Sequence, residues 1–199
     1  MNQQILMSIK PQHLVNILNG DKTIELRKRF PEDFRGWVYL YCTKDKKQPL
    51  ASFRFIEGWR YRIYGNNTYY SAGCTSNIGN DVNGKVVCRF WVDKVDTIIR
   101  SGMGYYVEGQ DRAYTNRLAN QSCLTFDDLQ KYFGDEEGRA IHISKLEIFD
   151  KPKELAEFHY YKKRLIDCGR DCPPYFDEVK TQVRKAPQSW QYIYIEEVI

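Results

Sequence analysis

A stretch near the N-terminus, LNGDKTIELRKRF at residues 18–30, concentrates cations and a glutamate in a few positions. In an extended chain, successive side chains point to opposite faces. The apolar face would carry Ile24, Leu26 and Phe30, and the polar face would carry Thr23, Glu25, Arg27 and Arg29. If the polar face lines a cleft, its arginines can contact phosphates or base edges, and Glu25 can accept a hydrogen bond from an exocyclic amine. Lys22 could then serve as a general base or a nucleophile.

The same pattern also fits an ordinary solvated strand face. In that case Glu25 and Arg27 only offset one another, an interaction that contributes little in water. Binding requires only that the cations face a cleft, whereas catalysis also requires a reactive Lys22. The residues alone leave both interpretations open.

Two further stretches carry candidate binding residues. Gln188 and Ser189 precede Trp190, whose ring could stack on a base or pack in the core. The stretch WRYRIY at residues 59–64 alternates aromatic and Arg side chains, which fits base stacking or a plain surface hairpin. For this second stretch we expect the hairpin.

Other residue types that often carry chemistry lack the expected spacing. Cys168 and Cys172 follow His159, but zinc sites usually have closer pairs and a second pair, so we expect no metal and no cofactor. His13 and His142 have no Ser or Cys partner at a recognisable spacing for a catalytic triad. The sequence also has no Gly-rich phosphate loop.

The overall composition is that of a globular domain. The chain has 199 residues, which is long enough for one domain to bury its own core, and a mild net charge of +4. Any affinity for nucleic acid must therefore come from local placement of charge. No apolar run is long enough to span a membrane and the start lacks the layout of a secretory signal, so we expect a cytoplasmic protein with no membrane contact. The six cysteines are then expected to be buried free thiols.

The local patterns predict where helices and strands lie. A helix should begin near Pro11 and end just before Gly20, and a second should run from Thr125, its N-cap, to Phe133. Period-two or apolar runs predict strands at 22–30, 36–43, 85–95, 139–149 and 189–198.

The remaining segments have no clear period. Residues 58–84 and 100–122 are predicted to form long functional loops, and 152–188 an insert with a helix around 168–174. Because the elements do not alternate regularly, we predict a mixed α/β, β-rich fold: a small, partly closed β barrel with helices at its ends.

Several motifs together resemble the ASCH domain family. They are SIKP at residues 8–11, GxKTxExR at 20–27, GWVYLYCT at 36–43, GKVV at 84–87 and PQSWQY at 187–192. The resemblance implies a PUA-like β barrel with a cleft that the KTxExR segment faces. Residues 1–199 would form a single domain of this kind, with inserts at about 58–84, 100–122 and 159–186 that the resemblance does not cover.

The resemblance also implies a function. Similar proteins are proposed to bind RNA, which makes RNA or a modified nucleoside the expected partner of this chain. The implied binding residues share positions in or beside the motifs, and they are Lys10, Thr23, Arg27, Arg29, Gln188, Ser189 and Trp190.

Some ASCH members are ribonucleases or remove the acyl group from acetylated cytidine, so a hydrolase is the alternative. The catalytic lysine of that amidohydrolase branch corresponds to Lys22, with Glu25 in place of its threonine partner. The branch also has an acidic residue that would fall near Asn120, where this chain has no carboxylate between Arg112 and Asp127. A third hypothesis is a protein-interaction scaffold that uses the Tyr-rich loops.

Overall fold

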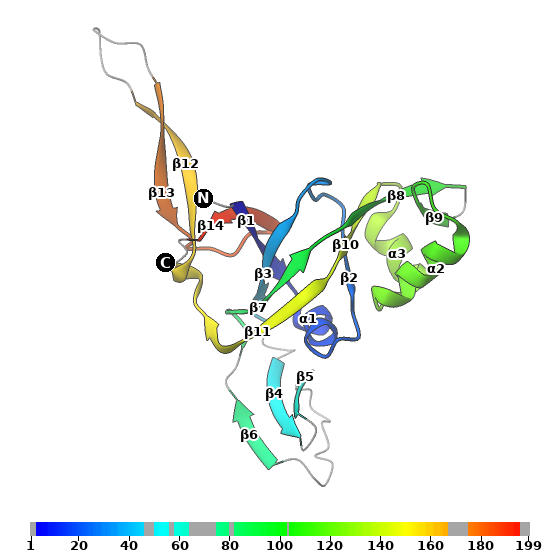
Figure 1. The fold of residues 1–199 in the computed structure, drawn as a ribbon, viewed down its shortest axis with the longest axis horizontal. Coiled ribbons are helices and arrows are strands. Elements are labelled where there is room, and N and C mark those ends of the chain that lie inside the picture. Colours follow the sequence, from blue (N-terminus) through cyan, green and yellow to red (C-terminus); the bar gives the residue numbers. More distant parts are fainter. Residues whose placement is uncertain are drawn as a thin grey trace.

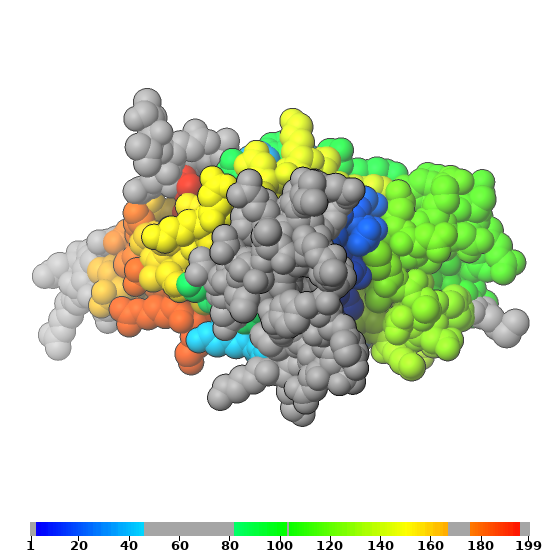
Figure 2. Space-filling model, turned by 90° about the horizontal axis from the view of Figure 1, so that it is seen from below, coloured from blue at the N-terminus to red at the C-terminus, as the bar shows by residue number. Residues whose placement is uncertain are grey.

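A computed structural model describes residues 3–45, 50–55, 58–63, 75–79, 82–102, 104–166 and 175–195. For residues 50–55, 58–63 and 75–79 we describe the backbone alone. The central sheet lies between two projecting parts, a helical part with α2 and α3 and a two-stranded hairpin of β12 and β13 (Figure 1). A space-filling view also places these two parts at opposite ends of the molecule (Figure 2).

The central sheet has seven strands in the order β11-β7-β3-β1-β14-β12-β13. Their bounds are β1 Gln3–Ile9, β3 Gly36–Cys42, β7 Val86–Val92, β11 Ser144–Lys153, β12 His159–Ile166, β13 Tyr175–Gln182 and β14 Trp190–Tyr194. β1 runs parallel to β3 and antiparallel to β14, so the first and last described strands pair in the middle of the sheet. The apolar run at 36–43 forms β3, which has neighbours on both sides as its composition predicted.

A second sheet has four strands in the order β2-β10-β8-β9. Their bounds are β2 Ile24–Arg27, β8 Val95–Ser101, β9 Gly104–Val107 and β10 Gly138–His142. Helices α2 (Arg112–Gln121) and α3 (Phe126–Phe133) pack on this sheet over a core that includes Ile24, Leu26, Leu118 and Phe133. The predicted capping of α3 is confirmed, because Thr125 and Asp128 form a reciprocal capping box.

Helix α1 (Pro11–Leu18) covers one face of the central sheet. Leu14 and Ile17 are fully buried against a core that includes Val38 and Leu40 of β3. Pro11 begins the helix, and Gly20 follows it with a positive φ of 82° that a side chain would disfavour. The opposite face of the sheet carries a separate core that includes Tyr39 and Phe158, beside the short 3-10 helix Leu155–Glu157.

A third sheet has the order β5-β4-β6, with β4 Leu50–Phe55, β5 Gly58–Ile63 and β6 Thr75–Gly79. β4 and β5 pair antiparallel, with Leu50 opposite Ile63 and Phe55 opposite Gly58, which agrees with the hairpin expected for residues 59–64. Residues 64–74 and 80–81 and the side chains of these strands lie outside the described residues, and so does this part of the Tyr-rich surface proposed as an interaction scaffold.

The predicted β-rich mixed fold is confirmed, but the predicted barrel is not found. Over the residues that the structure describes, the strands form three open sheets, and the central one ends at β11 and β13. β10 and β11 are separated only by Ile143. One nearly continuous stretch of chain therefore runs from the second sheet into the edge of the central sheet.

Two predicted inserts also differ from the expectation. Residues 100–122, expected to be a loop, contain the end of β8, all of β9 and helix α2, which Asp111 caps by accepting a hydrogen bond from the Tyr114 backbone. In the 159–186 segment, β12 and β13 pair antiparallel as two long strands, and the helix expected around 168–174 lies outside the described residues.

Within the described part of the chain, no helix has the length and apolar character needed to cross a membrane.

The described cysteines fit the prediction only in part. Cys42 and Cys88 are buried, as expected, but Cys123 is exposed. Cys168 and Cys172 lie outside the described residues, and in the described ranges no group of three or more His, Cys, Asp or Glu side chains is placed to hold a metal ion.

Candidate functional site

A pocket of about 640 Å³ opens where the end of β1, helix α1, strand β2 and helix α3 meet. We call it the β2 pocket. Its volume lies within the usual range for small-molecule sites. It is lined by Ser8, Ile9, Lys10, Gln12, His13, Lys22, Glu25, Leu26, Arg27, Thr43, Leu124, Asp128, Lys131, Tyr132 and Gln188. Lys22, Glu25 and Arg27 therefore line a concavity, which one of the two interpretations of the sequence required.

Local structure explains how β2 presents this face. The Lys22 backbone N–H donates to the carbonyl of Asn16, which holds the turn after α1 against the helix. Glu25 then pairs with Ile141 of β10, while Ile24 and Leu26 point into the second core. This alternation sends the side chains of Glu25 and Arg27 into the pocket.

Three ionisable side chains form a compact cluster at the base of the β2 pocket. Nζ of Lys22 lies 2.8 Å from Oε2 of Glu25, and Nη2 of Arg27 lies 3.0 Å from Oε1 of the same carboxylate. The contact to Lys22 is short enough for a strong ion pair. Arg27 also donates from Nη2 to the Ser8 carbonyl, which ties β2 to the end of β1. The side chains of Lys22 and Glu25 are only 3% and 6% exposed, so water screens the pair weakly.

The cluster shifts the protonation of its neighbours. Burial would raise the pKa of Glu25, but Lys22 and Arg27 together hold it below its ordinary value, so the carboxylate is charged at neutral pH. Burial and the nearby Lys22 lower the pKa of His13, which therefore presents a neutral imidazole to the pocket. The pocket thus contains a buried anion, cations and a neutral ring that can accept or donate a hydrogen bond.

The outer part of the β2 pocket is made by residues that the sequence patterns did not single out. Lys131 and Tyr132 come from α3 and are exposed, while Asp128 of the same helix is half-buried. A signal for them was present, because Leu129 and Phe133 are the buried residues of α3 and the residues between them must face elsewhere. What the sequence did not show is that this other face turns toward β2.

The predicted binding residues separate into two groups. Lys10, Lys22, Glu25, Arg27 and Gln188 all line the β2 pocket. The others, which are Thr23, Arg29, Ser189 and Trp190, do not.

Those four residues have other contacts or positions. The side chains of Thr23 and Arg29 are exposed, and Ser189 accepts a hydrogen bond from the Ser8 backbone through its carbonyl. Trp190 packs against Phe30 and donates from its indole nitrogen to the carbonyl of Arg29 at 2.7 Å. The core interpretation of Trp190 therefore fits its surroundings better than a stacking platform.

A second buried carboxylate, Asp96 of β8, has a structural role. It accepts a hydrogen bond from the Tyr114 hydroxyl at 2.6 Å, and it lies 2.7 Å from Nε2 of His142 and 2.9 Å from Nζ of Lys94. Burial would raise the pKa of Asp96, but these donors hold it below its ordinary value. The four residues include no Ser or Cys that could act as a nucleophile, so we interpret the cluster as the attachment of α2 to the sheet.

Comparison with known proteins relates this architecture to one solved fold. No family model matches the chain, and no curated protein matches it. The crystal structure of an ASCH protein from Zymomonas mobilis aligns with a TM-score of 0.51 and 14% sequence identity, covering 98% of this chain and 88% of that one. Two mutant forms of that protein align with TM-scores of 0.48 and 0.45, at 13% and 14% identity. At such low identity the similarity concerns the fold alone.

Proposed function

We propose that this chain, which has the ASCH domain fold, binds RNA or a modified nucleoside in the β2 pocket. One observation carries the proposal: four cationic side chains converge on the pocket around the buried Glu25 carboxylate. The cations are Lys10, Lys22, Arg27 and Lys131, and the second carboxylate of the lining is Asp128. The excess of positive charge suits a phosphodiester backbone.

The polar groups of the pocket suit a base that is turned out of a stack. The Glu25 carboxylate can accept a hydrogen bond from an exocyclic amine, and the amides of Gln12 and Gln188 can both donate and accept. Tyr132 is 40% exposed at the pocket edge and offers a ring on which a base can stack. Lys10 and Lys131 would then lie where the backbone of the same strand leaves the pocket.

The decisive test reverses the charge of single cations at the pocket edge. We expect Lys131→Glu and Lys10→Glu each to weaken binding of a labelled single-stranded RNA about tenfold at low salt. Each variant should also reduce the slope of log Kobs against log salt concentration by about 0.7, the value for one lost phosphate contact on a single strand. Fluorescence anisotropy titrations at several salt concentrations measure both quantities.

Arg29→Glu is the matched control, because Arg29 is an exposed cation on the same chain segment that does not line the pocket. It changes the net charge by the same amount and should leave the affinity nearly unchanged. The proposal is wrong if the pocket variants bind RNA as the unmodified protein does, or if Arg29→Glu weakens binding as much as they do.

A hydrolase that acts on RNA or on an acylated nucleobase is the second candidate. The observation that favours it is the presence of Lys22, Glu25 and the neutral His13 in one pocket. Against it, Nζ of Lys22 is engaged by Glu25 at 2.8 Å, whereas a base or nucleophile needs its lone pair free. The geometry therefore supports binding better than turnover.

Incubation with acetylcytidine and with labelled RNA separates the two candidates. We expect both substrates to stay intact, as measured by chromatography. Release of acetate or shortening of the RNA by the unmodified protein, lost in Lys22→Met, would instead favour the hydrolase. Met is preferred to a smaller side chain at position 22 because it fills a volume similar to that of Lys. The substitution also leaves Glu25 and Arg27 as an ion pair whose charges cancel.

A further inference from the structure

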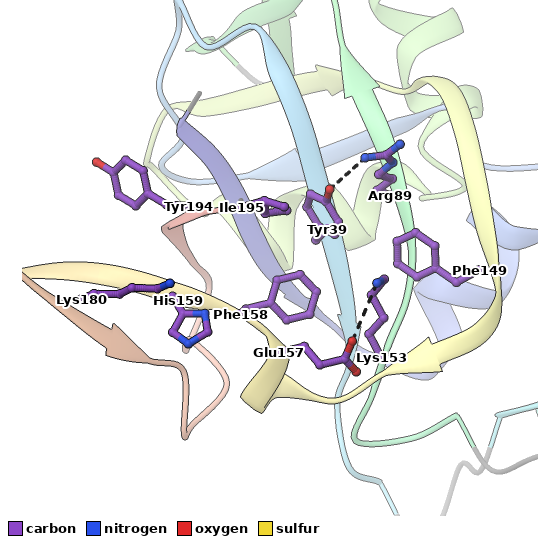
Figure 3. Close-up of a pocket in the computed structure, with 10 residues that line it drawn as sticks. All are labelled: Tyr39, Arg89, Phe149, Lys153, Glu157, Phe158, His159, Lys180, Tyr194 and Ile195. Carbon is purple, nitrogen blue, oxygen red and sulfur yellow. Dashed lines mark hydrogen bonds and ion pairs between the residues drawn. The ribbon is translucent and has the colours of Figure 1, made fainter. Parts of the chain in front are cut away.

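A second cavity lies on the other face of the central sheet, between its strands β3, β7 and β11 and the base of the β12–β13 hairpin (Figure 3). We call it the hairpin cavity, and its volume is about 500 Å³. Tyr39 and Phe158 form its buried floor, each only 4% exposed, and Phe149 of β11 adds a third ring. The rings of Phe149 and Phe158 lie 6.1 and 5.4 Å from that of Tyr39, so the floor is a continuous aromatic surface.

The hairpin cavity is distinct from the β2 pocket. Val38 and Leu40 of β3 pack with α1 on one face of the central sheet, whereas Tyr39, between them, packs with Phe158 on the opposite face. The β2 pocket lies at the α1 side, and the hairpin cavity lies at the Tyr39 side. Its outer wall comes from the 159–186 segment, which the sequence resemblance does not cover.

Cations from three different strands border this aromatic floor. They are Arg89 of β7, Lys153 of β11 and Lys180 of β13, and Glu157 is the one carboxylate of the described lining. In Figure 3, Arg89 and Lys153 lie on the same side of Tyr39 as Phe149. The lining therefore has an excess of positive charge.

The Arg89 guanidinium is held in place before any ligand arrives. It stacks on Trp37 at 4.1 Å, donates to the Tyr39 hydroxyl at 2.9 Å and pairs with Glu147 at 2.6 Å. Lys153 is held more loosely, because its contact to Glu157 is 3.8 Å long and both side chains are about half exposed. A pair of this kind contributes little and can yield Lys153 to a ligand anion.

We propose that the hairpin cavity is a second ligand site, which binds a nucleoside monophosphate. Arg89 and Lys153 offer charged N–H donors to a phosphate from two neighbouring strands. The aromatic floor matches a planar base ring, and the cavity has the size of a small-molecule site. The ring would lie against Phe149, the half-buried ring of the floor, and the phosphate would lie between Arg89 and Lys153.

Isothermal titration calorimetry with cytidine and adenosine 5′-monophosphate tests this site. We expect Lys153→Glu to weaken binding of at least one of them about tenfold, the size of one lost charged contact. Lys151→Glu is the matched control, because Lys151 is an exposed cation of the same strand that does not line the cavity. It should leave the affinity nearly unchanged, and inorganic phosphate and cytidine should each bind more weakly than the whole nucleotide.

The same variants distinguish this proposal from the proposed function of the β2 pocket. Lys131→Glu should weaken RNA binding and leave the affinity for the mononucleotide unchanged. Lys153→Glu should weaken mononucleotide binding and leave the affinity for RNA unchanged. The proposal is overturned if neither mononucleotide binds the unmodified protein, if Lys151→Glu and Lys153→Glu act alike, or if mononucleotide binding follows Lys131. Inorganic phosphate binding as tightly as the nucleotide would also overturn it, because the aromatic floor would then contribute nothing.

Discussion

Replacing Glu25 by Gln should destabilise the folded protein by about 3–5 kcal/mol, the cost of breaking a buried ion pair from one side. The Lys22 and Arg27 side chains are 3% and 12% exposed, and Glu25 is the partner of both. Without its carboxylate, two cations face each other with little water to screen them. Urea denaturation followed by circular dichroism measures the loss.

The comparison with Lys22→Met shows whether charge is the cause. That substitution removes one cation and leaves Glu25 with Arg27, so we expect a clearly smaller loss than for Glu25→Gln. In the double variant, Arg27 keeps its hydrogen bond to the Ser8 carbonyl, and the two losses should be less than additive. Equal losses in the two single variants would show that packing, and not the balance of charge, determines the stability of this site.

The same carboxylate makes a predictable contribution to the pH dependence of stability. The pKa of Glu25 in the folded protein lies below its ordinary value of 4.5, so its charged form favours folding. This contribution is fully present above pH 4.5 and is lost as the pH falls through the lowered pKa of the folded state. The difference in stability between the unmodified protein and Glu25→Gln should therefore shrink on acidification below pH 4.5. A difference that grows at low pH would mean that Glu25 is not charged in the fold.

The local patterns of the sequence predicted the elements whose signals lie within a few residues. The capping pattern of residues 125–133 and the apolar run of β3 both correspond to observed elements. Alternation also placed Glu25 and Arg27 on one face, although β2 itself is shorter than the predicted strand. These features follow from backbone geometry, which a short window of sequence encodes.

Features that depend on distant contacts were not predictable in the same way. Helix α2 lies in a stretch of mixed polarity, and only Leu118 of its residues is buried, so its amphipathic signal is weak. The pairing of β1 with β14 joins residues that are almost the whole length of the chain apart in sequence. Beside that pairing, the Ser8 hydroxyl donates to the Pro187 carbonyl. Neither the arrangement of the strands into separate sheets nor the approach of α3 to β2 is visible in a local pattern. The sequence therefore predicted the β-rich fold but not its open sheets, and it missed Lys131 and Tyr132.

Replacing Gly138 by Ala should destabilise the protein by about 1–3 kcal/mol, because the site has no room for a methyl group. A Cβ atom at Gly138 would lie 2.6 Å from Cζ of Phe133 and within contact distance of two further ring carbons. Phe133 is 1% exposed and packs against Tyr105, so its ring has no free space into which it can move. The added methyl must therefore push α3 away from β10. Because Lys131 and Tyr132 lie on α3, RNA binding should weaken together with stability.

Gly104→Ala is the matched control for this effect. Gly104 also lies in a strand of the second sheet, but the nearest atom to a Cβ there is the Tyr106 hydroxyl at 3.3 Å, at the end of a side chain that can move. We expect a change within about 0.5 kcal/mol for this surface strand position. A smaller side chain at position 133 should relieve the clash. The double variant Phe133→Leu/Gly138→Ala should therefore lose less stability than the sum of the losses of the two single variants. Urea denaturation of the unmodified protein, the two single variants and the double variant measures these losses. Strictly additive losses would show that α3 does not rest on Gly138 and that other contacts position the wall of the β2 pocket.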